Sequence, residues 1–141
     1  MKKIKFVLII VLFISLRVSG QNTPDFFLNK EQSSILKEYG NYDFIVTRNE
    51  EDFTINVYEK NKQYALKFLF DENKKISCVV FATNNHEIAQ FYLENNDSIY
   101  KSHIFVEDQI QWTDKKTVTV FFKFQEQNNY PYQYTYVRYE K

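Results

Sequence analysis

Few residues of this chain have the types and spacing that catalysis requires. His86 and His103 are its two histidines, and each has an acidic neighbour in the sequence, Glu87 or Asp97. An imidazole beside a carboxylate can act as a general base or bind a metal. Cys78, the one cysteine, lies in an apolar run without an adjacent base, which favours a core role over a nucleophilic one. A small hydrolase that uses His86 or His103 with a nearby carboxylate is one hypothesis; two ordinary surface histidines are the other.

The signatures of nucleotide-binding and metal-binding enzymes are missing. After residue 20 the only glycine is Gly40, so neither a phosphate-binding loop nor a dinucleotide fingerprint can be built in the usual way. The sequence also lacks a G-x-S-x-G elbow, an H-E-x-x-H helix and a Cys/His cluster with metal spacing. We therefore predict no catalytic residue, no cofactor and no metal, and favour a protein that is not an enzyme.

A row of tyrosines near the C-terminus is the most unusual pattern that could bind a ligand. Tyr130, Tyr132, Tyr134 and Tyr136 alternate with other residues, so a strand would place all four on one face. Such rings suit sugars, peptides or another protein, because they offer contact area at a small entropy cost and a hydroxyl for hydrogen bonds.

The exposure of this row depends on the register of a predicted hairpin. A two-residue turn at Asn128-Asn129 would place the tyrosines on the side of Lys123 as an exposed ribbon, which Trp112 could extend. The candidate ligand-binding residues are then Tyr132, Tyr134, Tyr136, Lys123 and Trp112. A one-residue change in the loop would instead stack the tyrosines over the Phe/Val stripe of the preceding strand. For Trp112 we favour the alternative of a core anchor together with Ile110.

Two helices and a set of short strands must position these residues. Thr23 and Pro24 predict a helix over 24–39 that Gly40 ends as a left-handed cap. A second helix is predicted over 86–95, and Asn95-Asn96 would end it. Alternation with a period of two predicts strands over 42–48, 53–59, 64–70, 76–82, 103–106, 109–112, 117–124 and 132–139.

The order of these elements predicts an α+β fold. We expect a curved antiparallel sheet of about seven strands with two helices packed on one face, in the order α-β-β-β-β-α-β-β-β. The run 76–82 is apolar on both sides and should be central in the sheet. A β-sandwich or a barrel is the main alternative, because the predicted strand content is high.

Residues 1–20 are predicted to be a cleavable signal peptide, and residues 21–141 a single α+β domain. Three lysines precede an apolar run over 6–16 that is too short to span a bilayer comfortably. Val18 and Gly20 then supply small residues before a cleavage site. An uncleaved N-terminal anchor is the alternative. After cleavage the protein should not span a membrane.

The leader and the composition resemble exported proteins of the Bacteroidetes. Lys, Asn, Ile, Phe and Tyr are abundant, and the short lysine-led leader ends in Ser-Gly before Gln21. The resemblance covers the first 21 residues and implies a periplasmic or secreted location.

The charge balance argues against nucleic acid as a partner. The whole chain has 18 basic and 18 acidic residues. Removal of four basic residues with the leader leaves 14 against 18, a net charge of about −4. Our leading hypothesis is an exported, non-catalytic binding module for an unknown protein, peptide or glycan. Besides the hydrolase, an accessory subunit of an envelope complex is possible, and an exposed apolar patch or an unpaired strand edge would mark it.

Overall fold

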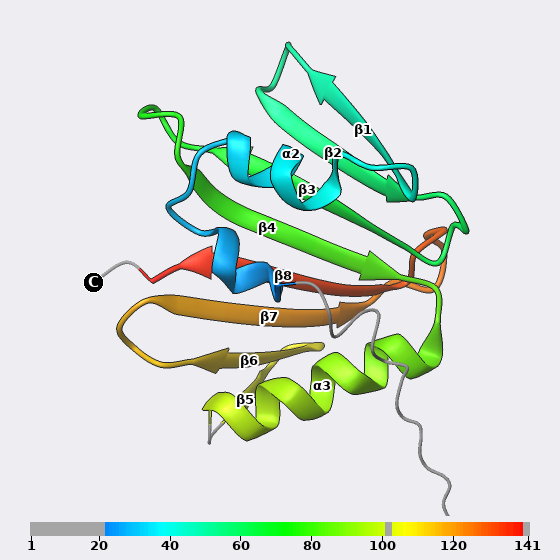
Figure 1. Ribbon diagram of the computed structural model, residues 1–141. Coiled ribbons are helices and arrows are strands. Elements are labelled where there is room, and N and C mark those ends of the chain that lie inside the picture. Colours follow the sequence, from blue (N-terminus) through cyan, green and yellow to red (C-terminus); the bar gives the residue numbers. More distant parts are fainter. Residues whose placement is uncertain (1–21, 101–102, 140–141) are drawn as a thin grey trace, which may run out of the picture.

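The computed structural model describes residues 22–100 and 103–139, and there it forms one antiparallel sheet with helices packed against it (Figure 1). The predicted signal peptide lies outside the described residues. The helical elements are η2 (Pro24–Phe27), α2 (Ser33–Tyr39) and α3 (His86–Tyr100). The strands are β1 (Phe44–Asn49), β2 (Thr54–Glu59), β3 (Tyr64–Phe70), β4 (Ile76–Thr83), β5 (His103–Val106), β6 (Gln109–Thr113), β7 (Val118–Phe124) and β8 (Tyr132–Arg138).

Two four-stranded meanders make up the sheet. The strand order is β1-β2-β3-β4-β8-β7-β6-β5, so the last strand of each meander, β4 or β8, lies at the centre. The α+β class and the antiparallel sheet are confirmed, as is the central place of β4. The sheet has eight strands rather than about seven, and it is open, so the sandwich and barrel alternatives are wrong.

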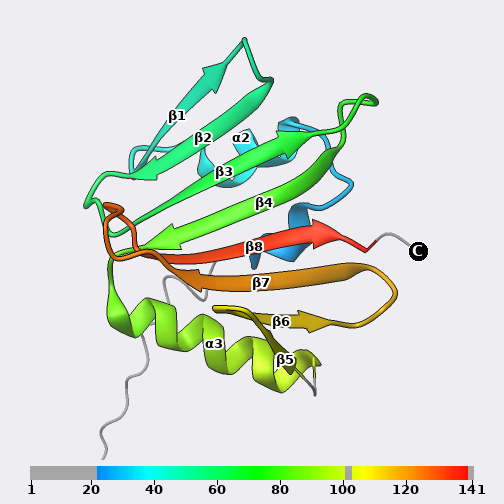
Figure 2. The same cartoon turned by 180° about the vertical axis from the view of Figure 1, so that it is seen from behind.

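The helices cover one face of the sheet. Phe27 of η2 and Tyr39 of α2 pack against Phe68 of β3, and Tyr92 of α3 packs against Phe81 and Tyr134 of the central strands. The residues of neighbouring strands that pair directly with Phe68, Phe81 and Tyr134 lie on this same side of the sheet and are mostly buried. Figure 2 views the sheet from the opposite side, with α2 behind the strands.

The predicted helix over 24–39 is wrong in its middle. It is split into η2 and α2, because Asn29 takes a left-handed φ of 70°. The backbone around the break pairs with β4 instead: Asn29 N–H donates to the Ile76 carbonyl and Ile76 N–H donates to the Lys30 carbonyl, both at 2.8 Å. Tertiary hydrogen bonds thus replace helical ones over these residues.

Gly40 follows α2 as predicted, but not as a left-handed cap. Its φ is −86°, and its N–H donates to the Leu36 carbonyl. A Cβ at this position would lie 2.5 Å from that carbonyl oxygen, so close approach of the backbone, not a positive φ, requires glycine here.

The second helix is longer than predicted. Asn85 caps it by accepting hydrogen bonds from the N–H groups of Glu87 and Ile88, but Asn95-Asn96 do not end it. Asn96 is 1% exposed and faces the sheet, and the helix continues to Tyr100. None of the described helices combines the length and apolar character that a membrane crossing needs.

Candidate functional site

The C-terminal hairpin has the second of the two registers considered above, which stacks the tyrosines over the Phe/Val stripe, so the exposed tyrosine ribbon does not form. Tyr132, Tyr134 and Tyr136 pair with Phe124, Phe122 and Val120, one residue away from the register that a turn at Asn128-Asn129 would impose. The β7–β8 loop spans residues 125–131, and Gln125 N–H donates to the Pro131 carbonyl inside it. This longer loop turns the tyrosines toward the helices.

The two central tyrosines of the row are buried. Tyr134 is 0% exposed and Tyr136 is 1% exposed. The Tyr134 hydroxyl donates to the Ala89 carbonyl of α3, and burial raises the pKa of both phenols above the usual range. Tyr132 is half-buried and its hydroxyl lies 3.2 Å from His86 Nδ1.

Trp112 is a core residue, as the favoured alternative predicted. It is 1% exposed, and its Nε1–H donates to Asp97 Oδ1 at 2.8 Å. Of the five candidate ligand-binding residues, Lys123 alone lies on the other face of the sheet, where it pairs with Gln133 and is half-exposed.

The two histidines lie at opposite ends of α3. His86 begins this helix of 15 residues and His103 follows its end, so roughly 20 Å of helix separates them. His103 Nδ1 is 3.6 Å from Asp97 Oδ1, and both side chains are well exposed. Within residues 22–100 and 103–139, no three His, Cys, Asp or Glu side chains come together as a metal site. The geometry therefore does not unite the histidines into one reactive centre.

The face of the sheet opposite the helices is the candidate functional site, which we call the open face (Figure 2). The register defines its side chains, because directly paired residues share a face. Across the four central strands β3, β4, β8 and β7 they form three rows. These rows are Leu69–Cys78–Val137–Thr119, Lys67–Val80–Thr135–Phe121 and Ala65–Ala82–Gln133–Lys123.

The centre of the open face is apolar and partly accessible. Cys78, Val80 and Ala82 of β4 all point to it, and each is half-buried rather than enclosed. Leu69 and Val137 extend this centre to either side of Cys78. An antiparallel sheet with one solvated face normally carries polar residues there, so an apolar central strand departs from that pattern.

The open face has an uneven charge. Lys67 and Lys123 are its charged strand residues within the described chain, and it has no acidic strand residue, although the domain carries excess negative charge. Burial raises the pKa of the Cys78 thiol, which keeps it protonated and poorly nucleophilic.

Tyr130 of the β7–β8 loop lies near the end of β2. Partial burial, together with the nearby side chains of Tyr58 and Glu59 in β2, raises the pKa of its phenol. The loop therefore reaches past β8, β4 and β3 toward β2, as Figure 2 shows at the end of these strands.

A polar depression of about 600 Å³ lies at one end of the sheet, between the β3–β4 turn, the β6–β7 turn and the end of β8. At its centre Arg138 Nη1 donates to Asn29 Oδ1 at 2.8 Å and pairs with Asp71 Oδ2 at 2.9 Å. Hydrogen bonds from the Lys75 and Asn73 N–H groups and the pairing with Arg138 lower the pKa of Asp71.

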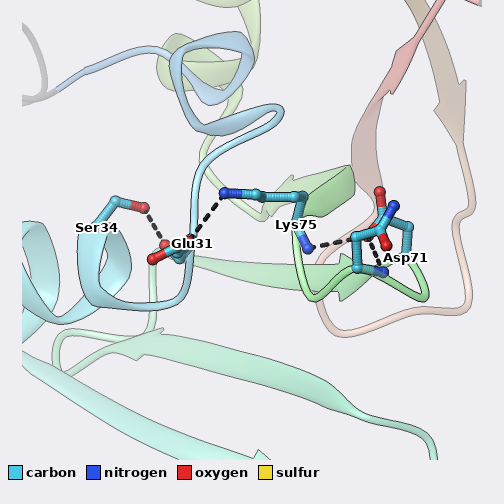
Figure 3. Close-up of polar contacts among 5 residues, drawn as sticks. Glu31, Ser34, Asp71 and Lys75 are labelled. Atoms are coloured by element: carbon cyan, nitrogen blue, oxygen red, sulfur yellow. Dashed lines mark hydrogen bonds and ion pairs between the residues drawn. The ribbon is translucent and has the colours of Figure 1, made fainter.

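The groups of this depression join chain segments together. Lys75 also forms an ion pair with Glu31 at 2.9 Å, which links the β3–β4 turn to the segment before α2 (Figure 3). Arg138 Nη1 contacts both Asn29 and Asp71, whereas the buried Nε has no partner among the described residues. We interpret the cluster as a structural link between the segment after η2, the β3–β4 turn and β8.

Comparison with known proteins adds no family to this description. The chain matches no protein-family model, no curated protein and no solved structure.

Proposed function

We propose that this protein is an exported, non-catalytic module that binds a protein partner through the open face of its sheet. The observation that carries the proposal is the accessible apolar centre formed by Leu69, Cys78 and Val137 on three adjacent strands. A half-exposed apolar surface on a rigid sheet needs little ordering on binding, so its burial contributes directly to affinity. The leader over residues 1–20 supports a periplasmic or secreted location.

The charge on the open face indicates the chemistry of the partner. Lys67 on β3 and Lys123 on β7 are three strand spacings apart, on the order of 15 Å, on either side of the apolar centre. A partner surface with apolar side chains between two carboxylates would match them. Phe121 lies in the row next to Lys123 and supplies the aromatic contact that protein interfaces favour.

Site-specific photo-crosslinking in the producing cell tests this proposal. A benzophenone amino acid at Val80 or Phe121 should form a discrete adduct with one protein, whereas the same probe at Leu36 of α2 should not. Leu36 is a matched control, because it is apolar and 50% exposed but lies on the helix side. Equal adducts from both sides, or none from the open face, would reject the proposal; an adduct with a glycan would replace the protein partner by a saccharide.

The identified partner then allows a quantitative test by calorimetry. Phe121→Ala should weaken binding about tenfold or more, as expected for an aromatic contact at the centre of an interface. Lys67→Glu with Lys123→Glu should weaken binding and reverse the dependence of affinity on salt concentration, because salt would then screen a repulsion. Lys37→Glu on α2 is the control and should leave both quantities unchanged. Unaltered affinity in the double lysine variant would show that the partner is not acidic.

A further inference from the structure

β5 is an edge strand without the usual protection against pairing. It is the last strand of the sheet, and in the described part of the chain it pairs with β6 alone. All four of its residues are exposed, including Ile104 at 57% and Phe105 at 72%. Natural edge strands are commonly blunted by lysine, proline or a bulge, and β5 has none of these.

The opposite edge of the sheet differs in this respect. β1 ends in Thr47, Arg48 and Asn49, all exposed, so polar and charged side chains occupy half of that edge. Ile45 is the exposed apolar residue of β1, and its neighbours Phe44 and Val46 are buried and half-buried. Of the two edge strands, β5 is the one with fully exposed apolar residues on both faces.

The peptide groups of Phe105 are directed outward. Glu107-Asp108 form a two-residue turn, so the closing pair Val106–Gln109 is of the hydrogen-bonded kind. Alternation along β5 then turns the N–H and C=O groups of Phe105 and His103 away from β6. They are the groups that a further strand would engage.

We propose that β5 pairs with β5 of a second copy of this chain, antiparallel and centred on Phe105. A two-fold axis perpendicular to the sheet keeps the open faces of both copies on the same side. Residues that lie opposite one another across the new pair of strands must therefore belong to the same face. In this register each Phe105 lies opposite its counterpart, Ile104 lies opposite Val106, and His103 of one copy lies beside the β5–β6 turn of the other, which carries Glu107. The segment is therefore complementary to itself in shape and in charge.

The pairing would join the two sheets into one. The two-fold axis would place both open faces on the same side of one continuous sheet, to which each copy contributes eight strands. The dimer would then present the proposed binding surface twice, and a partner with two matching sites would bind with avidity.

Cysteine crosslinking tests the register. Directly opposed residues in an antiparallel pair have Cα atoms about 5.5 Å or less apart, within the range that a disulfide spans. In a Cys78→Ser background, Phe105→Cys should form a covalent dimer under mild oxidation, whereas Ile104→Cys should not. Ile104→Cys combined with Val106→Cys should crosslink again. A dimer from Ile104→Cys alone would overturn the register.

Sedimentation over a range of concentrations tests the association without any crosslink. The mature chain should shift from monomer to dimer, and Phe105→Lys should remain monomeric; its side chain is exposed, so the fold should persist in circular dichroism. Phe124→Lys on β7, at a residue that is 48% exposed, is the control and should leave the dimer intact. A monomer at every concentration, or a dimer that Phe105→Lys does not dissociate, would overturn the proposal, whatever the crosslinks at Val80 and Phe121 show.

Discussion

At the residue scale, the two fully buried tyrosines of β8 differ in how their hydroxyls are satisfied. The Tyr134 hydroxyl donates to the Ala89 carbonyl, whereas the Tyr136 hydroxyl faces the buried Asn96 side chain without a well-formed hydrogen bond. Tyr134→Phe should lower the free energy of unfolding by about 1 kcal/mol, because it removes a made hydrogen bond. Tyr136→Phe should change it by less than about 0.5 kcal/mol, because the contact between its hydroxyl and Asn96 is not a well-formed hydrogen bond. Urea unfolding of both variants checks this, and equal losses would show that Tyr136 does have a partner.

The residue scale is also where sequence reasoning about the site failed. The alternation of tyrosines was sufficient to place them on one face, but the choice of face depended on the length of the β7–β8 loop. Asn128-Asn129 is compatible with a tight turn, yet neither asparagine takes a positive φ here. Lys123 was identified only because the wrong register placed the tyrosines on its face. The residues that define the open face could have been found from β4, whose outward positions are all apolar.

At the scale of elements, the turn between β6 and β7 depends on one carboxylate. Asp114 Oδ1 accepts hydrogen bonds from the N–H groups of Lys116, Thr117 and Val118. Partial burial opposes its ionisation, but these bonds and the Thr117 hydroxyl outweigh it and hold its pKa well below the usual range.

The lowered pKa of Asp114 gives a prediction about acid stability. An aspartate whose pKa is lower in the folded state than in the unfolded state stabilises the fold. This stabilisation is complete above the unfolded-state pKa of about 3.9 and is lost as the pH falls through the folded-state pKa. Asp114→Asn should therefore lower the melting temperature at pH 7, and its difference from the wild type should shrink below about pH 4. Asp108→Asn in the β5–β6 turn, which makes no hydrogen bond with described residues, is the control. A difference that stays constant down to pH 2 would contradict the assignment.

The elements themselves were predictable to different degrees. The predicted strand bounds are close to the observed ones, because the period-two pattern is local and the turns between strands are short and polar. The helix over 24–39 failed because Asn29 and Lys30 bond to Ile76, a contact that no local pattern contains. The end of α3 failed because Asn96 resembles a terminator in sequence but is buried against the sheet. Tertiary packing overrode local propensity in both helices.

At the scale of the whole molecule, stability should fall from the centre of the sheet to its edges. β4 and β8 are paired on both sides and lie beneath η2 and α3, whereas β5 has four exposed residues and one partner strand. Amide hydrogens that exchange through local opening report this difference directly. In dilute solution, exchange should be slowest at Val79 and Tyr136 of the two central strands and fast at Phe105.

Amide hydrogen exchange at high protein concentration also tests the proposed β5 dimer. Pairing of β5 with a second copy would bury the outward N–H of Phe105 in a hydrogen bond, while the inward N–H of Ile104 is already bonded to β6. Raising the protein concentration should therefore slow exchange at Phe105 more than at Ile104, and should leave the β1 amides unchanged. The Phe105→Lys variant should show no dependence on concentration at position 105. Protection that rises equally at both edges would indicate non-specific association, because only a defined β5 interface distinguishes one edge of this sheet from the other.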